Sequence, residues 1–193
     1  MTSKLDTLGS PPDAGIAPGG AHDVVIADAR RRRLVLAAMC VALVAVISSV
    51  SGLNVAQQAL ATDLGATQSQ LLWIINAYTL VLAALLMPVG AIGDRWGRKP
   101  ILLLGLVVFS LSNVASAFST DPTTLIGLRV LAGVGAAMIM PVTLSVITTS
   151  FPREEQAKAI GIWAGFAGAG GIIGLFVSAA VIDNATWPWV FAL

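Results

Sequence analysis

The sequence contains little charge and few of the residues that build catalytic or metal sites. Only 11% of its 193 residues are charged, and it has one cysteine and one histidine. Cys40 lies inside an apolar run with no second cysteine, so no internal disulfide can form. With His22 alone near the N-terminus, no pair of Cys or His has the spacing of metal ligands. We therefore expect no metal, no cofactor and no catalytic residues.

Apolar surface is what the chain has in excess. Hydrophobic residues make up 56% of the sequence, and the mean hydropathy is +0.87. Mostly apolar runs of about 18 residues or more are typical of membrane-spanning helices. Five such runs predict an all-α integral membrane protein, with spans at 34–56, 71–92, 101–119, 124–148 and 157–182. A sixth run, WPWVFAL, begins at Trp187 and reaches Leu193.

The basic residues gather in alternate connections between these spans. They precede the first span, join the second to the third, and join the fourth to the fifth: Lys4, residues 30–33, Arg95, Arg98, Lys99, Arg153 and Lys158. Under the positive-inside rule, this alternation places the N-terminus and the basic connections in the cytoplasm. We expect a multi-pass protein of the cell membrane, in contact with the lipid bilayer.

Residues 1–33 differ from the rest of the chain. They are rich in Pro, Gly, Ala and Asp, show no periodicity and end in four arginines, which predicts a disordered cytoplasmic tail. Residues 34–193 would then form the helical bundle. The arginine run reads as an anchor on the membrane surface, or as a specific site for a lipid or partner.

One basic residue lies inside a span. Arg129 is about a turn and a half into the fourth span. A charge at that depth costs at least a few kcal/mol unless it faces protein or water. We therefore expect Arg129 to face a cavity between the helices, where it serves transport or coupling, or acts as a purely structural buried arginine.

The connection between the second and third spans combines glycines with charges, at Gly90, Asp94, Arg95, Gly97, Arg98 and Lys99. Anchoring requires the basic residues but does not explain the glycines. The string Gly-x-x-x-Asp-Arg-x-Gly-Arg-Lys resembles the signature loop of the major facilitator superfamily, which joins its second and third helices. The resemblance implies that the first glycine permits close helix approach. It also implies that the aspartate pairs with basic residues and faces a helix N-terminus in the other half of a transporter. Anchoring and gating both remain open for the basic residues.

Other stretches extend this resemblance from about residue 35 to the end. LLWIINAYTLVLAALLMPVG and LRVLAGVGAAMIMP resemble the second and fourth helices of the fourteen-helix drug:proton antiporters, the EmrB/QacA-like branch, whose fourth-helix arginine matches Arg129. GLNVA is similar to the end of that branch's first helix. The resemblance implies the N-terminal part of a transporter that exports small amphipathic compounds or drugs by alternating access.

The chain also departs from that branch. Ser49 stands where the branch has an acidic residue in its first helix. The fifth span reads GLFVSA from Gly174, where the antiporter motif has Gly-Pro followed two residues later by Gly-Gly. All the acids lie in the tail or at turns, whereas proton relays use acids or histidines inside the spans. Coupling to protons would therefore need residues beyond this chain.

The remaining candidates lie inside the spans. Asn76, Tyr78 and Asn113 could line a substrate path or form hydrogen bonds between helices. Small residues permit close helix packing, which is the role expected of Gly133, Gly161, Gly165, Gly170 and Gly174.

We thus expect a transporter of small molecules with no nucleic-acid partner. An alternative reading is a truncated chain or gene fragment without transport of its own, acting by association with other membrane subunits, since the superfamily needs two six-helix halves. A third reading is a membrane enzyme that uses Arg129 and the acids of the loops.

Overall fold

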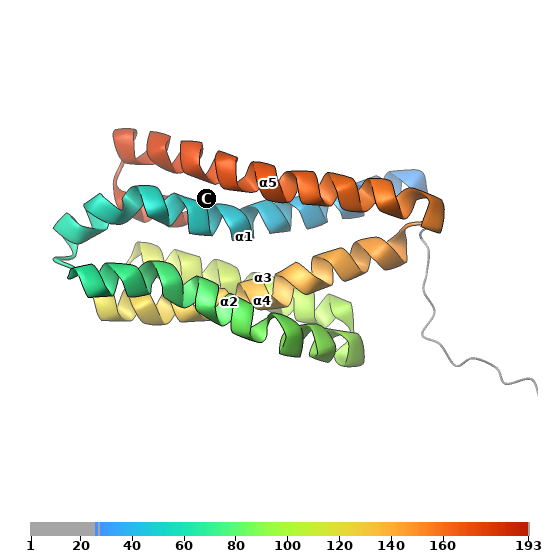
Figure 1. Cartoon of the computed structure of the whole chain (residues 1–193), viewed down its shortest axis with the longest axis horizontal. Helices are drawn as coiled ribbons and strands as arrows, with labels where there is room; N and C mark the ends of the chain where they lie inside the picture. The colour runs from blue at the N-terminus through green and yellow to red at the C-terminus, as the bar shows by residue number, and fades with distance from the viewer. Residues whose placement is uncertain (1–25, 27, 193) are drawn as a thin grey trace, which may run out of the picture.

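A computed structural model describes residue 26 and residues 28–192 of the chain. In this part, five long helices precede a short 3₁₀ helix: α1 (Ala29–Asp63), α2 (Gln68–Trp96), α3 (Arg98–Ala117), α4 (Pro122–Ser150), α5 (Arg153–Asn184) and η1 (Trp187–Ala192). Each of the five is long and apolar enough to cross a membrane. Successive helices run in opposite directions along one axis (Figure 1). The prediction of an all-α membrane fold with five spans is confirmed, and the sixth run forms η1.

The arginine run belongs to a helix. α1 begins at Ala29, four residues before residue 33, where the tail was expected to end, because the Asp28 side chain accepts a hydrogen bond of 2.9 Å from the Arg30 amide. Arg32 donates to the Ile26 carbonyl over 2.8 Å and forms a 3.1 Å ion pair with Glu155 of α5. The expected boundary is therefore wrong at residues 29–33, while the tail at residues 1–25 lies outside the described residues.

Local signals define the other helix ends. Thr67 and Gln70 form a reciprocal capping box at the start of α2. Asp121 accepts a 2.8 Å hydrogen bond from the Thr124 amide, and Pro122 occupies the first turn of α4. α2 and α3 are separated only by Gly97, whose φ of +99° few other residues adopt.

The helices pack in two groups, with α2 and α3 against α4, and α1 against α5 (Figure 1). Small residues allow these close approaches. A Cβ added at Gly133 would lie 2.7 Å from the Tyr78 carbonyl oxygen of α2, and one at Gly174 would lie 2.6 Å from the Ser48 Cα of α1. Gly170 similarly faces Val44, at 3.2 Å.

The same spacing does not imply packing for two other glycines of α5. Gly161 and Gly165 are exposed, and an added Cβ would meet nothing within 4 Å among the described residues. Their interpretation as packing residues does not hold between these helices, because they lie on a face of α5 that no described helix covers.

Candidate functional site

An interior polar cluster surrounds Arg129, which has no exposed surface. Its Nε donates to the Ile74 carbonyl of α2 over 3.3 Å, and its Nη1 donates to Ser49 Oγ of α1 over 3.0 Å. The guanidinium carbon lies 4.3 Å from the centre of the Tyr78 ring, a cation–π distance. The Tyr78 hydroxyl in turn donates to the Val46 carbonyl over 3.0 Å.

The cluster continues into α3. Ser49 Oγ donates to Asn113 Oδ1 over 3.3 Å, and Asn113 Nδ2 donates to the carbonyl of Phe109 over 2.8 Å. We call Arg129, Ser49, Tyr78 and Asn113 the Arg129 cluster; its members come from four helices. Their bonds connect α4 with α1, α2 and α3, so the cluster couples the two groups of helices.

The structure meets the expectation for Arg129 only in part. The side chain turns into the protein, as the cost of charge in hydrocarbon requires. It does not lie on the wall of an open cavity, because helices enclose it completely. Its Nη2 has no hydrogen-bond partner among the described residues.

Asn76 does not join this cluster. It is exposed, and no hydrogen bond connects it to another described residue. Positions 74 and 78 of α2 are four apart and share the face toward α4, whereas position 76 lies on another face. Tyr78 and Asn113 are thus brought together with Arg129, and Asn76 is separated from them.

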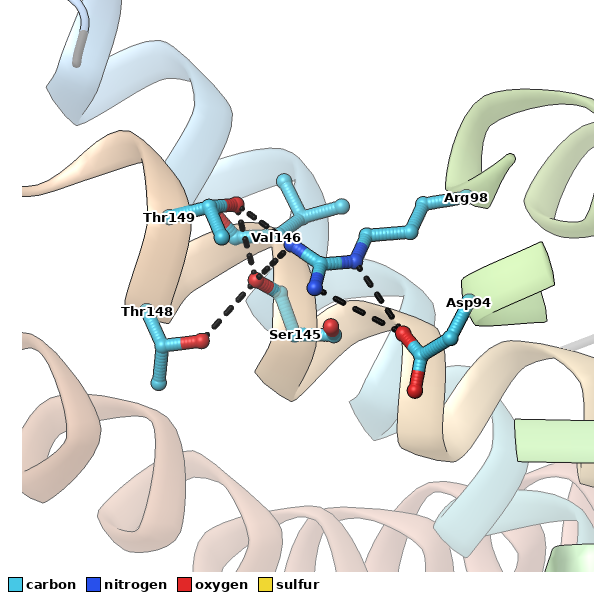
Figure 2. A network of polar contacts seen from close by, with 6 residues as sticks. All are labelled: Asp94, Arg98, Ser145, Val146, Thr148 and Thr149. Carbon is cyan, nitrogen blue, oxygen red and sulfur yellow. Dashed lines mark hydrogen bonds and ion pairs between the residues drawn. The ribbon is translucent and has the colours of Figure 1, made fainter. Parts of the chain in front are cut away.

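The residues of the expected signature loop lie in the last turns of α2, at Gly97 and in the first turn of α3. Arg98 fastens this α2–α3 loop to the end of α4 (Figure 2). Arg98 Nη1 donates to the Ser145 carbonyl over 3.2 Å and to Thr149 Oγ1 over 2.9 Å. Arg98 Nε lies 3.5 Å from Asp94 Oδ1, so Asp94 has the local partner that its spacing indicates. The Asp94 side chain remains 67% exposed.

The other residues of this loop have different environments. Arg95 and Lys99 are exposed, and neither forms an ion pair with another described residue. A Cβ added at Gly90 would lie 3.6 Å from Pro141, an ordinary contact, so the described helices do not require a glycine there. Gly97 is required by its positive φ.

Several partners had no signal in the sequence. Ser49 stood out only as a departure from a family pattern, yet it is the side chain that binds Arg129. Ser145 and Thr149, which hold Arg98, were not singled out. Such contacts depend on how each helix is rotated about its axis, which residue types alone do not reveal.

The basic connections share one end of the bundle. The start of α1, the α2–α3 junction and the α4–α5 junction lie together, opposite the other three connections (Figure 1). This arrangement is what the alternation of basic residues requires if that end is cytoplasmic. Within the described residues, no group of three or more His, Cys, Asp or Glu could hold a metal ion.

Sequence comparison matches the chain to one family profile and to several named relatives. The profile of the Major Facilitator Superfamily matches residues 34–193. The methyl viologen resistance protein SmvA of Salmonella typhimurium is 38% identical over 164 residues, which are 84% of this chain and 33% of that protein. The multidrug efflux pump LfrA of Mycolicibacterium smegmatis is 38% identical over 159 residues, 82% of this chain and 31% of that protein. The chain thus spans about a third of the length of these relatives.

Structure comparison agrees on the fold. A bacterial homologue of the human lysosomal transporter Spinster, in an inward-facing and unoccupied conformation, matches with a TM-score of 0.69 and 21% identity. The match covers 86% of this chain and 40% of that chain. At this identity the likeness supports the helical arrangement alone.

Proposed function

The chain belongs to the major facilitator superfamily, and on this premise we propose that it forms the first helices of an exporter of small amphipathic compounds. Residues 34–193 would be part of the N-terminal bundle of a transporter that works by alternating access. The superfamily is one of transporters rather than enzymes, and the named relatives include drug-resistance and efflux proteins. The substrates of the whole protein are part of this proposal.

The observation that carries the proposal is the geometry of the α2–α3 loop. Arg98 holds this loop to the last turns of α4 through Ser145 and Thr149, which connects α2, α3 and α4 at this end of the bundle. Asp94 pairs through one oxygen at 3.5 Å and stays mostly exposed. An exposed carboxylate on a braced loop suits a contact that forms and breaks as two halves of a transporter move.

The orientation is also proposed. We place the N-terminus and the basic end of the bundle in the cytoplasm, and the protein in the cell membrane, because the basic residues gather at that end. The bilayer and a small-molecule substrate are then its partners, with protons coupled through residues beyond this chain.

A chimera tests the proposal. Residues 34–193 would replace the matching helices of the Salmonella methyl viologen resistance protein, in a strain that lacks its own copy of that protein. We expect the chimera to restore growth on methyl viologen, Asp94→Asn to abolish that growth, and Asp63→Asn at the opposite end of the bundle to preserve it. A chimera present in the membrane at the normal level that gives no more resistance than the empty vector contradicts the proposal.

A further inference from the structure

The arginine run at the start of α1 is divided by the fold into one inward side chain and three exposed ones. Arg32 turns toward α5, where it forms the 3.1 Å ion pair with Glu155 and its side chain is only 13% exposed. Arg30, Arg31 and Arg33 are exposed. With 3.6 residues in each turn, Arg31 and Arg33 lie about 100° to either side of Arg32. They therefore border the contact between α1 and α5, whereas Arg30 lies on the opposite face of α1.

A further basic side chain at this contact comes from α5. Both α1 and α5 begin at the end of the bundle that carries the basic connections, and their first turns lie side by side (Figure 1). Lys158 is exposed and lies three positions after Glu155, so these two residues share one face of α5. Arg31, Arg33 and Lys158 therefore lie around the ion pair that joins the two helices, and we call these three residues the α1–α5 basic site.

The acids near this site leave its positive charge largely uncompensated. None of its three side chains forms an ion pair with another described residue. The acids in the first turns of the two helices are Asp28, Glu154 and Glu155. Asp28 accepts a hydrogen bond from the Arg30 amide as the cap of α1, and Glu155 pairs with Arg32. Within residues 28–33 and 153–158, only Glu154 is an acid without such a contact, so the surface stays positive.

The α1–α5 basic site lies directly beside the outward apolar surface of both helices. On α1 the next residue is Leu34, which is 63% exposed, and two turns later Val41 is 69% exposed. On α5 Ile162, four positions after Lys158, is 38% exposed. Cations one turn away from exposed apolar side chains of a span lie at the boundary of the hydrocarbon, where long basic side chains reach the lipid headgroups.

We propose that Arg31, Arg33 and Lys158 bind the headgroup of an anionic phospholipid. The headgroup phosphate would accept charge-assisted hydrogen bonds from the two guanidinium groups and the ammonium group. A zwitterionic headgroup carries a positive charge of its own, so its attraction to the site would be weaker. The Arg32–Glu155 pair would keep α1 and α5 together and leave its neighbours free to face the lipid. This binding does not depend on the export proposed above, and it is measured without transport.

The test uses the purified 193-residue chain in a non-ionic detergent, with its thermal unfolding followed by circular dichroism. Phosphatidylglycerol and phosphatidylcholine with the same acyl chains are added separately. A ligand that binds only the folded state raises the unfolding midpoint as its concentration exceeds the dissociation constant. We expect a larger rise with phosphatidylglycerol than with phosphatidylcholine. Sodium phosphate, compared with sodium chloride at equal ionic strength, supplies the phosphate without the lipid and should give no rise.

Two triple variants that each remove three positive charges provide the matched comparison. The site variant combines Arg31→Gln, Arg33→Gln and Lys158→Gln, and the control variant combines Arg30→Gln with changes of two exposed residues at the α2–α3 junction, Arg95→Gln and Lys99→Gln. Each basic residue near a membrane surface contributes roughly fivefold to the affinity for anionic lipid. The site variant should therefore need on the order of 100-fold more phosphatidylglycerol for the same rise, whereas the control variant should respond as the unchanged chain does.

Three results would overturn the proposal. The first is an equal rise of the midpoint with the two lipids in the unchanged chain. The second is a control variant that loses as much of the response as the site variant, because the effect would then follow total charge rather than this site. The third is a rise with sodium phosphate as large as that with phosphatidylglycerol, because the ligand would then be a free anion. Each variant is compared with itself across lipids, so a difference in basal stability does not affect the result.

Discussion

A guanidinium buried within a membrane-spanning helix needs acceptors nearby, and two helices, α1 and α2, provide the surroundings of Arg129. Ile74 offers a carbonyl, Ser49 a hydroxyl and Tyr78 the face of its ring. The inward direction of Arg129 could be predicted, because the cost of charge in hydrocarbon depends on residue type alone. The identity of its partners could not, because it depends on the rotation of α1 and α2 against α4.

At the signature loop, the two charged residues of the Asp94–Arg98 pair should differ in their effect on stability. Asp94→Asn removes an exposed pair between neighbouring turns, which is worth ~0–1 kcal/mol. Arg98→Ala also removes the bonds to Ser145 and Thr149, each worth about 1 kcal/mol. We therefore expect Arg98→Ala to lower the free energy of unfolding more than Asp94→Asn. The measurement is denaturant unfolding of the purified chain in micelles, and an equal or larger loss for Asp94→Asn would show that the loop is not braced through Arg98.

At the scale of elements, the number and position of the helices were predictable, whereas their ends and packing faces were not. Long apolar runs bounded by prolines and polar residues predicted five spans, which the structure confirms. Most helices continue past the predicted ends because polar residues prolong them, as the arginine run does in α1, whereas α3 ends at Ala117, two residues before its predicted end at residue 119. The glycine spacing of α5 predicted close packing along the helix, yet Gly170 and Gly174 meet α1 while Gly161 and Gly165 meet nothing. Spacing along a helix does not reveal which face has a neighbour.

Two glycines of α4 offer a matched test of helix packing. An alanine Cβ at position 133 would approach the Tyr78 carbonyl oxygen to 2.7 Å, whereas one at position 127 would meet nothing within 4 Å. Gly133→Ala should therefore force α4 away from α2, at a cost of about 1–3 kcal/mol. Gly127→Ala should be neutral or stabilise the helix by up to ~1 kcal/mol. Thermal unfolding of both variants checks this, and equal midpoints would contradict the close contact of α4 with α2.

At the scale of the whole molecule, the proposed orientation in the membrane can be tested at the connections between helices. Thr123 lies at the start of α4 and Glu154 at the start of α5. Both are exposed, and they lie at opposite ends of the bundle. The single native cysteine, Cys40, is buried and should stay unlabelled. With an impermeant thiol reagent added to intact cells, Thr123→Cys should react and Glu154→Cys should react only after the cells are opened. The opposite pattern would reverse the proposed topology.

The whole chain also lacks a candidate carrier for protons inside its described spans. Ser49 cannot exchange a proton with water at physiological pH in the way that a carboxylate can, and the described acids lie at helix ends or turns. Residues 34–193 should therefore take part in transport only together with helices that supply such groups.

Dye movement in proteoliposomes measures whether the chain alone couples a proton gradient to transport. The Salmonella chimera and the 193-residue chain are reconstituted separately into vesicles that enclose ethidium, and a pH gradient is imposed. We predict gradient-driven loss of ethidium from the chimera vesicles, and loss from the vesicles of the chain alone no faster than from protein-free vesicles. Gradient-driven loss through the chain alone at the rate of the chimera, or none through a chimera recovered folded from the vesicles, would contradict the account.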